Sequence, residues 1–304
     1  MSALLFPGQG SQIVGMGSEL HSSFDLVKNI FSQADDKLNY PISKIILDGP
    51  ENELQLTKNT QPAILTVSYS IFKVLKDEFN FDFSSFKYFA GHSLGEYSAL
   101  VCSDSLNFKD ALYLLHERGK AMQQAVPVGK GKMIAILGIK TNEIINILKT
   151  IEKEKGICQI ANDNAEGQVI VSGNKAKVEF LQNILKEKKI KSIPLKVSAP
   201  FHCSLMKPAA EIMKNKIENT NFKNPLFKIV NNVTANSEID AKNIKELLVK
   251  QIFSTVKWRE SIINMSKSGV KNFVEIGPGK VLTGMVKRTV KQANYFSINS
   301  IGDI

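Results

Sequence analysis

Short apolar runs alternate with longer segments of helical spacing along most of the chain. Strand-like runs lie at 3–6, 86–90 and 271–276, and each ends at a glycine-containing turn. Elsewhere apolar residues recur at intervals of three and four, which predicts amphipathic helices. These helices begin at Thr60-Gln61-Pro62 and near Phe108, and cover 96–102, 244–252 and 281–290. The first start is placed at Thr60 because proline is favoured in the first helical turn. The pattern predicts a mixed α/β fold.

A different order of elements follows a linker-like stretch at 126–131, which contains one proline and two glycines. We predict strands at 133–139, 157–161, 168–172 and 190–197, and helices at 141–154 and 175–188. Thr141 is a suitable N-cap, and 162–167 is expected to form a hairpin turn. The order β-α-β-β-α-β defines a ferredoxin-like unit. We therefore predict a small domain at 127–198, inserted into a larger domain formed by 1–126 and 199–304.

The most informative motif is Gly91-His92-Ser93-Leu94-Gly95, which joins the run at 86–90 to the helix at 96–102. In a strand, Gly-x-Ser-x-Gly, helix arrangement the serine occupies a sharp turn with its hydroxyl exposed. The start of the helix also directs free N–H groups and the positive end of its dipole towards charge that develops beside the serine. Such a pentapeptide also occurs in ordinary glycine-rich turns. The flanking strand and helix favour Ser93 as a nucleophile.

Four histidines are available as a base for that nucleophile. His202 follows a predicted strand, and Pro200 stiffens its approach, so it is the natural candidate. His21 and His116 lie in polar helical contexts and are expected to be solvated. His92 adjoins Ser93, where its side chain can point away from the site and serve packing. The sequence therefore points to a pair formed by Ser93 and His202.

Two further polar residues lie on apolar helix faces. Arg118 either snorkels or pairs with a structural carboxylate, or it is placed to bind a substrate carboxylate through two parallel N–H groups. Gln251 falls on the apolar face of the helix at 244–252, where a buried amide must find partners. Near the N-terminus, two glycines flank Gln9 and let its backbone approach a ligand, although a plain loop is the alternative. The glycines at 8, 10, 15 and 17 lack the spacing of a dinucleotide-binding loop.

Composition narrows the class of protein. Of the 304 residues, 43% are hydrophobic and 22% charged, which is typical of globular domains. No run approaches the roughly 18 apolar residues of a membrane span, and the N-terminus lacks the basic region of a signal peptide. Cys102, Cys158 and Cys203 are widely separated, so neither a disulfide framework nor a zinc site is indicated. We expect a cytoplasmic protein with no membrane span and no metal.

The net charge of +10 predicts anionic partners. Nucleic acid is one candidate class, but the lysines are scattered, and the densest cluster, at 186–191, is typical of a solvated face. No nucleic-acid-binding motif is present. An acidic carrier protein or a phosphate-rich thioester accounts for the charge equally well.

With these residues identified, the chain resembles the malonyl-CoA:acyl carrier protein transacylases of bacterial fatty-acid synthesis over essentially its whole length. Several spaced motifs in one order are more specific than any single motif. The resemblance implies a large α/β-hydrolase-like domain with a parallel sheet core and an inserted ferredoxin-like domain. The matching segments are Phe6-Pro7-Gly8-Gln9-Gly10-Ser11-Gln12, Thr60-Gln61-Pro62-Ala63, Gly91-His92-Ser93-Leu94-Gly95-Glu96, Arg118-Gly119-Lys120-Ala121-Met122-Gln123, Asn162-Asp163-Asn164, Phe201-His202, Gln251 and Glu275-Ile276-Gly277-Pro278-Gly279.

The resemblance also implies roles. Ser93 is the acylated nucleophile and His202 its base, with the N–H groups of Gln9 and Leu94 as the oxyanion hole. Arg118 holds the malonyl carboxylate, and a main-chain carbonyl near Gln251 orients His202. Supporting positions are Gln251, His92, Asn162 and Phe201. The family often has serine at the position of Phe201. Related polyketide acyltransferases with phenylalanine there favour malonyl over methylmalonyl units. Malonyl therefore remains the expected acyl group.

The implied reaction is a ping-pong transfer from malonyl-CoA to the phosphopantetheine thiol of an acidic acyl carrier protein, without a cofactor. Two other classes remain open from the residues. An esterase or thioesterase uses the same Ser–His chemistry with water as acceptor. A basic adaptor for acidic carriers or nucleic acid needs no catalysis at all. The insertion between Ser93 and His202, together with Arg118, favours a transferase of an anionic acyl group.

Overall fold

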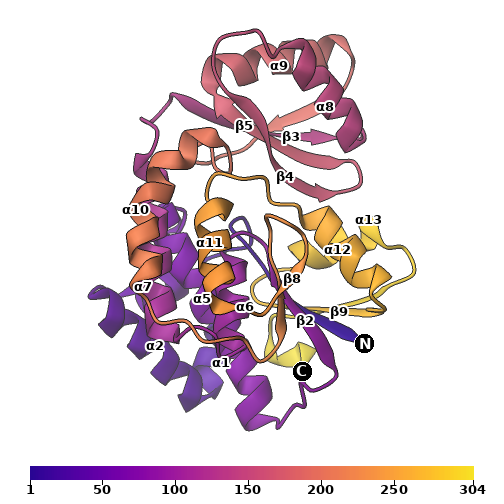
Figure 1. Ribbon diagram of the computed structural model, residues 1–304. Helices are drawn as coiled ribbons and strands as arrows, with labels where there is room; N and C mark the ends of the chain where they lie inside the picture. The colour runs from indigo at the N-terminus through magenta and orange to yellow at the C-terminus, as the bar shows by residue number, and fades with distance from the viewer.

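Two β-sheets form the frame of the molecule, which the computed structural model describes over residues 1–304 (Figure 1). The larger sheet has the strand order β10-β9-β1-β2-β7-β8, and all neighbours are parallel except β7 and β8. Its strands are β1 (Ser2–Phe6), β2 (Phe86–Gly91), β7 (Lys228–Val230), β8 (Ser237–Glu238), β9 (Asn272–Ile276) and β10 (Asn294–Ile298). The central strands pair Phe6 with Gly91. The turns that follow β1 and β2 therefore meet at the carboxyl edge of the sheet, where parallel α/β sheets bind ligands.

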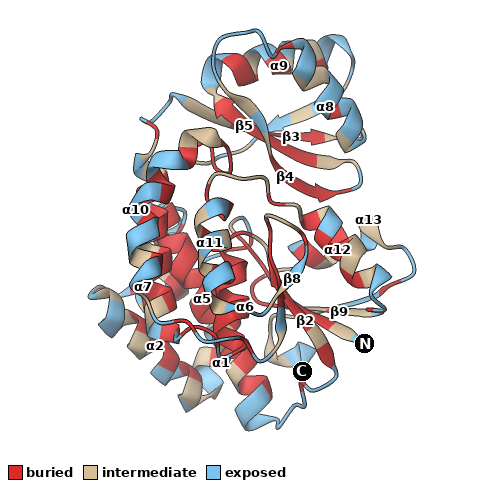
Figure 2. Ribbon diagram, viewed as in Figure 1, coloured by how far each residue is buried: buried red, intermediate tan, exposed pale blue.

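Helices cover both faces of this sheet. Successive side chains of a strand point to opposite faces, so Leu4 and Phe6 of β1 join a core of 54 buried residues while Ala3 and Leu5 join a second core of 16. Figure 2 shows the buried strands between helices whose outer sides are exposed. The helices are α1 (Ser18–Ser23), α2 (Asp25–Leu38), α3 (Ile42–Leu47), α4 (Glu51–Leu54), α5 (Thr57–Lys73), α6 (Gly95–Cys102), α7 (Phe108–Gln124), α10 (Lys207–Glu218), α11 (Ala241–Gln251), α12 (Trp258–Lys267) and α13 (Val281–Thr289), with short π or 3-10 turns η1 (Val74–Glu78), η2 (Ser204–Met206) and η3 (Ile301–Asp303).

The second sheet forms a small lobe above the first in Figure 1. It runs from β3 (Gly131–Leu137) through α8 (Thr141–Thr150), β4 (Cys158–Ala165), β5 (Gln168–Asn174) and α9 (Lys175–Glu187) to β6 (Lys191–Pro194). All its pairs are antiparallel, and the strand order is β4-β5-β3-β6. Nine buried residues form a separate core there. The α/β class with a parallel core and a small antiparallel sheet is confirmed. The exact domain boundaries at 126/127 and 198/199 stay a prediction.

The start predicted for the first helix was wrong. Helix α5 begins at Thr57 rather than Thr60, so Pro62 lies inside it. Proline has no N–H for the carbonyl four residues earlier, and His116 Nδ1 donates to that carbonyl, Lys58 O, at 3.0 Å. His116 is therefore partly buried and bonded rather than solvated. His21 is also only partly exposed, because its ring packs 5.0 Å from that of Phe31.

Two local predictions in the small lobe also need correction. Strand β4 continues to Ala165, so 162–164 belong to the strand and the turn narrows to 166–167. The extended strand is stabilised by an additional pairing of Asn162 with Val256 of the large lobe. The N-cap of α8 is the extended Lys140, and Thr141 is the first helical residue, whose hydroxyl donates to Asp163 Oδ1 at 3.0 Å. None of the helices combines the length and apolar character that crossing a membrane requires.

Candidate active site

The turn between β2 and α6 has the strained backbone that the glycine motif predicts. Ser93 has a φ of 54°, in the left-handed region that residues other than glycine rarely occupy. A Cβ on Gly91 would collide with the backbone of Gly95, and one on Gly95 would collide with the carbonyl of Phe6. Only glycine therefore allows β1, β2 and α6 to approach so closely. This close approach places Ser93 at the carboxyl edge of the sheet.

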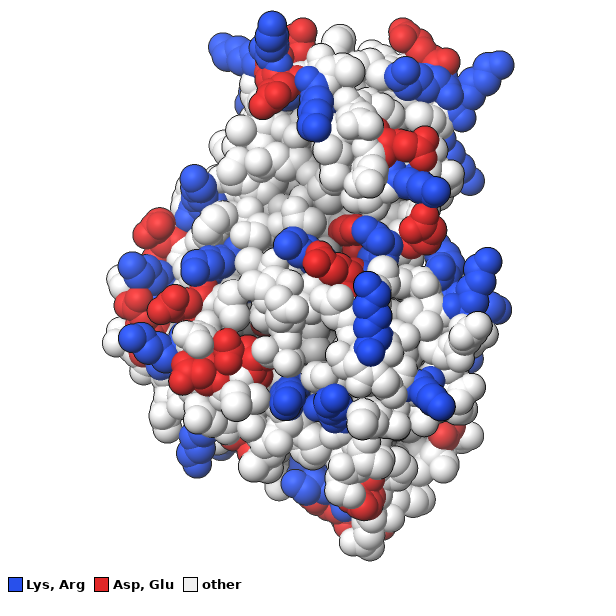
Figure 3. Space-filling view, turned by 45° about the vertical axis from the view of Figure 1, so that its right-hand side comes forward, with Lys and Arg blue, Asp and Glu red and all other residues white.

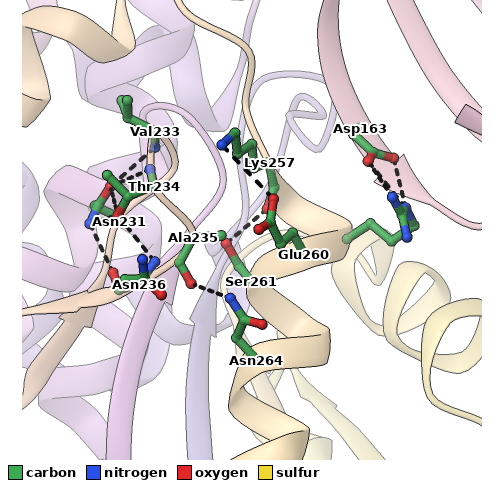
Figure 4. Close-up of polar contacts among 11 residues, drawn as sticks. Asp163, Asn231, Val233, Thr234, Ala235, Asn236, Lys257, Glu260, Ser261 and Asn264 are labelled. Carbon is green, nitrogen blue, oxygen red and sulfur yellow. Dashed lines mark hydrogen bonds and ion pairs between the residues drawn. The ribbon is translucent and has the colours of Figure 1, made fainter. Parts of the chain in front are cut away.

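Asn232 secures this turn from the loop between β7 and β8. Its Oδ1 accepts from the Ser93 N–H at 2.7 Å, and its Nδ2 donates to Gly91 O at 2.8 Å. The neighbouring Asn231 keeps the loop rigid, since its side chain bonds to Thr234 N and Asn236 O at 2.9 and 2.8 Å (Figure 4). The loop is also tied to α12, whose Asn264 donates to a loop carbonyl. A fixed loop thus holds both sides of the serine turn.

Ser93 and His202 form a hydrogen-bonded pair. Ser93 Oγ lies 2.8 Å from His202 Nε2, and His202 Nδ1 lies 2.9 Å from the main-chain oxygen of Gln251. A carbonyl only accepts, so the Nδ1 atom carries the proton and Nε2 is free to accept one from the serine. Burial, with the positive charge of Arg118, lowers the pKa of His202 to about 3. The imidazole is therefore a neutral base at physiological pH.

Arg118 on α7 is buried beside this pair without any carboxylate partner. It is 1% exposed, and no ion pair of the chain includes it. Its Nη1 donates to Gln61 Oε1 at 2.7 Å, while Nη2 donates to Gln251 Oε1 at 2.8 Å and to Ser93 Oγ at 3.1 Å. The Nε–H has no partner, and one N–H of Nη1 is also left over. Burial lowers the pKa of the guanidinium, but its ordinary value is so high that it remains charged.

A buried acid lies beneath the turn. Glu96, in the first turn of α6, is 1% exposed. Its Oε2 accepts from Gln251 Nε2 at 2.8 Å and from the Asn232 N–H at 3.1 Å. Burial raises the pKa of this carboxyl to about 7, although these bonds and Arg118 oppose the rise. The sequence reasoning overlooked both Glu96 and Asn232. A charged residue in an otherwise apolar helix was the signal that could have identified Glu96.

The sequence-predicted residues meet at one pocket between the two lobes. It is lined by residues of both, among them Gln9, Gln61, His92, Ser93, Leu94, Arg118, Asn162, Gln168, Phe201, His202 and Val281. The backbone N–H groups of Gln9 and Leu94 donate to no other group of the chain. Gln251 does not line the pocket itself but contacts two residues that do, Arg118 through its side chain and His202 through its carbonyl.

The supporting positions have clear contacts. His92 Nε2 lies 2.8 Å from Asn164 Oδ1, so this histidine links the serine turn to the small lobe. Burial lowers its pKa, which favours the neutral ring. Asn162 lines the pocket from β4, two residues from the side chain that bonds His92. Phe201 is buried, and its carbonyl accepts from Ser172 Oγ at 2.7 Å. No group of three or more His, Cys, Asp or Glu side chains is arranged to hold a metal ion.

Comparison with known proteins gives a consistent picture. The family model described as "Acyl transferase domain" matches residues 3–304. A protein of Haemophilus influenzae named malonyl CoA-acyl carrier protein transacylase is 44% identical over 300 residues, which cover 98% of this chain and 95% of the relative. A crystal structure of an acyl carrier protein S-malonyltransferase from Vibrio cholerae superposes with a TM-score of 0.95 at 40% identity, covering 99% and 98% of the two chains. A malonyl-transacylase solved in complex with a type II PKS acyl-carrier protein also gives a TM-score of 0.95, at 40% identity over 99% and 97%.

Proposed function

The chain belongs to the acyl transferase family and is a malonyl-CoA:acyl carrier protein transacylase, and from this premise we propose how its residues carry out the reaction. It moves a malonyl group from malonyl-CoA to the thiol of an acyl carrier protein. The observation that carries the assignment of roles is Arg118, buried beside the Ser93–His202 pair without a direct ion pair. A buried cation held by neutral amides retains its attraction for an anionic substrate.

In the first half-reaction Ser93 Oγ attacks the thioester carbonyl carbon of malonyl-CoA, and its proton passes to His202 Nε2. The tetrahedral intermediate then collapses with cleavage of the C–S bond. His202 returns the proton to the departing CoA thiolate, which leaves a malonyl ester on Ser93. The neutral imidazole described above suits this step, because a protonated ring has no free lone pair at Nε2.

In the second half-reaction the phosphopantetheine thiol of the carrier attacks the ester carbon. Its proton passes to His202, the bond to Ser93 Oγ breaks, and the serine oxygen recovers the proton. The carbonyl of Gln251 keeps the imidazole in the required tautomer throughout. The chain needs no third acid for this purpose, because a main-chain oxygen is an acceptor that never titrates.

Both half-reactions place negative charge on the carbonyl oxygen. We assign its stabilisation to the backbone N–H groups of Gln9 and Leu94, whose lack of other partners supports this role. Leu94 directly precedes α6, so the positive end of that helix adds to the effect. Donors held in place before the reaction need no reorganisation when the charge develops.

Arg118 is proposed to hold the malonyl carboxylate. One Nη1–H remains available to a substrate, and the Nη2–H that bonds Ser93 Oγ lies beside the reacting centre. Burying a carboxylate without a partner is costly, so an acyl group bearing one is accepted only where such donors are present. Phe201 and Met122 narrow the same pocket, and we propose that they disfavour acyl groups bulkier than malonyl.

The carrier is proposed to be acidic and to approach over basic residues near the pocket mouth. Lys196 and Lys280 adjoin pocket-lining residues, and Arg288 Nη1 donates to the lining Gln168 at 2.8 Å. All three are exposed, and none pairs with a carboxylate. On the face that Figure 3 shows, basic and acidic side chains are intermixed. The partner is therefore proposed to meet local positive charge near the site.

The family acts on its substrates directly, and we propose that this chain also uses no cofactor, since Ser93, His202 and Arg118 supply every group that the reaction requires. We also propose a reducing cytoplasm as its location, which is consistent with three free cysteines, two of them buried.

Intact-mass measurement tests the proposed function. Purified protein mixed with malonyl-CoA should gain one malonyl group, and addition of holo carrier should remove it. Ser93→Ala should show no gain. Release of free malonate faster than transfer to carrier would instead indicate a thioesterase, and the absence of any adduct would indicate a non-catalytic adaptor.

A further inference from the structure

Glu96 takes no part in the steps above, yet its nearest partners hold all three reacting side chains. It accepts from Asn232, whose side chain fixes the Ser93 turn, and from Gln251. Gln251 in turn contacts Arg118 through its side chain and His202 through its carbonyl. The Glu96 carboxyl is thus linked through a single intervening residue to the nucleophile Ser93, to the base His202 and to Arg118.

The orientation of the Gln251 amide is the critical feature. Its Nε2 faces three acceptors, Glu96 Oε2 at 2.8 Å, Ser93 O at 3.0 Å and Asn232 Oδ1 at 3.4 Å. Its Oε1 faces the Arg118 Nη2 donor at 2.8 Å. A half-turn of the amide would oppose oxygen to oxygen on one side and N–H to N–H on the other. Of the three acceptors, only Glu96 has an ionisable side chain, and it makes the shortest bond.

We propose that Glu96 is a positioning residue for malonyl recognition, which keeps Gln251 Oε1 turned towards Arg118 and so fixes the guanidinium for the malonyl carboxylate. This inference rests on the proposed role of Arg118. Without the Glu96 acceptor, Gln251 Nε2 keeps only the longer bonds to Ser93 O and Asn232 Oδ1, so the amide that gives Oε1 to Arg118 is held less firmly. If the Gln251 amide turns an N–H towards Arg118, the guanidinium is repelled and shifts. A shifted guanidinium weakens binding of the malonyl carboxylate more than it slows the chemistry at Ser93.

The test compares transfer from malonyl-CoA and from acetyl-CoA to holo carrier. Glu96→Gln keeps an acceptor oxygen, so both specificity constants should stay within about threefold of the parent. Glu96→Met fills similar space without an acceptor for the Asn232 N–H and Gln251 Nε2. It should lower the malonyl-to-acetyl ratio by about tenfold or more, mainly through the KM for malonyl-CoA. Glu96→Asp, which retains charge but is one methylene shorter, should shift the ratio in the same direction and decides the question if the Met variant does not fold.

The matched control is Glu275, another carboxyl that is 1% exposed. It accepts from the N–H groups of Leu282 and Thr283 at the start of α13 and contacts none of the three reacting residues. Glu275→Met should lower the melting temperature and leave the malonyl-to-acetyl ratio unchanged.

Calorimetry in the Ser93→Ala background separates binding from chemistry. There Glu96→Met should weaken malonyl-CoA and leave acetyl-CoA nearly unaffected. An unchanged ratio in both Glu96→Met and Glu96→Asp, or an equal loss for the two substrates, overturns the inference while the proposed function stands. A parent enzyme that forms no malonyl adduct overturns the proposed function, and with it this inference.

Discussion

Replacing Arg118 with alanine should convert a malonyl-selective enzyme into an indiscriminate and slow one. The substrate carboxylate would then enter a pocket whose remaining polar neighbours are amides and hydroxyls. Removal of one member of a buried ion pair costs about 3–5 kcal/mol. At about 1.36 kcal/mol per tenfold change in rate, the carboxylate contact alone corresponds to a loss of roughly 10²–10⁴ in kcat/KM for malonyl-CoA.

Acetyl-CoA has no carboxylate, so it should lose only what Arg118 provides at the nucleophile. The bond from Nη2 to Ser93 Oγ, 3.1 Å long, is the single contact of that kind. A hydrogen bond to a charged group contributes about 1.5–3 kcal/mol, so acetyl transfer should fall by roughly 10–100-fold. The same contact is lost with malonyl-CoA. The ratio of the two specificity constants should therefore drop by about the full effect of the carboxylate contact.

The assay measures kcat/KM with both thioesters and holo carrier, for the parent, Arg118→Ala and Arg118→Lys. Lysine keeps the charge but lacks the planar fork, so it should restore only part of the malonyl preference. Melting temperatures are measured in parallel, since Arg118 also bonds Gln61 and Gln251. Equal losses for both substrates, together with lower thermal stability, would refute the clamp and leave Arg118 as a structural residue.

Three further predictions concern charge. His202 should stay neutral, and its imidazole NMR signals should not titrate between pH 5 and 8, because its pKa is lowered to about 3; a midpoint near 6.5 would contradict this. Folding raises the pKa of Glu96 from 4.5 to about 7, so its stabilising contribution is complete below pH 4.5 and is lost as pH rises through 7. Glutamine does not titrate, so the unfolding free energy of Glu96→Gln minus that of the parent should rise by roughly 3 kcal/mol between pH 4.5 and 8, as measured by urea titration. The same difference at both pH values would argue against a buried titrating carboxyl. Finally, the double variant Lys196→Glu/Arg288→Glu should raise the KM for carrier about tenfold at low salt and leave kcat unchanged. The control Lys109→Glu should have little effect on either constant. Equal KM values for the two variants, or a carrier kcat/KM that does not fall at high salt, would exclude electrostatic steering of the carrier by basic residues at the pocket entrance.

The sequence identified residues whose chemistry is visible in their type and local pattern. Ser93 stands out because of its glycines, His202 because of the turn after Pro200, and Arg118 because a cation on an apolar face requires an explanation. Asn232 escaped notice because asparagine pairs are common in turns, and its two bonds across the serine turn depend on a loop far away in the chain. Glu96 escaped notice because an acid in the first helical turn already has a local explanation in the helix dipole.

The prediction of where α5 begins was wrong for a related reason. Proline at the first turn is a sound local rule, and it placed the start at Thr60. The structure begins the helix at Thr57 because His116, from another helix, satisfies the carbonyl that Pro62 leaves without a donor. A tertiary contact thus overrides the local preference. Local rules place helices and turns well where the backbone satisfies itself, and fail where a distant side chain completes the hydrogen bonding.

Backbone strain at the two reacting residues shows why the site is assembled from distant segments. Ser93 and His202 both lie in the left-handed region, with φ of 54° and 57°, and such positions cost about 1–3 kcal/mol each. Neither turn can hold this geometry by local bonds alone. Asn232 braces the first from the β7–β8 loop, and Ser172 of β5 braces the second through the carbonyl of Phe201. The small lobe therefore braces the turn that carries His202, while the large lobe braces the Ser93 turn and orients the His202 imidazole through the Gln251 carbonyl. The distance of 2.8 Å between Ser93 Oγ and His202 Nε2 thus depends on how the two lobes are joined.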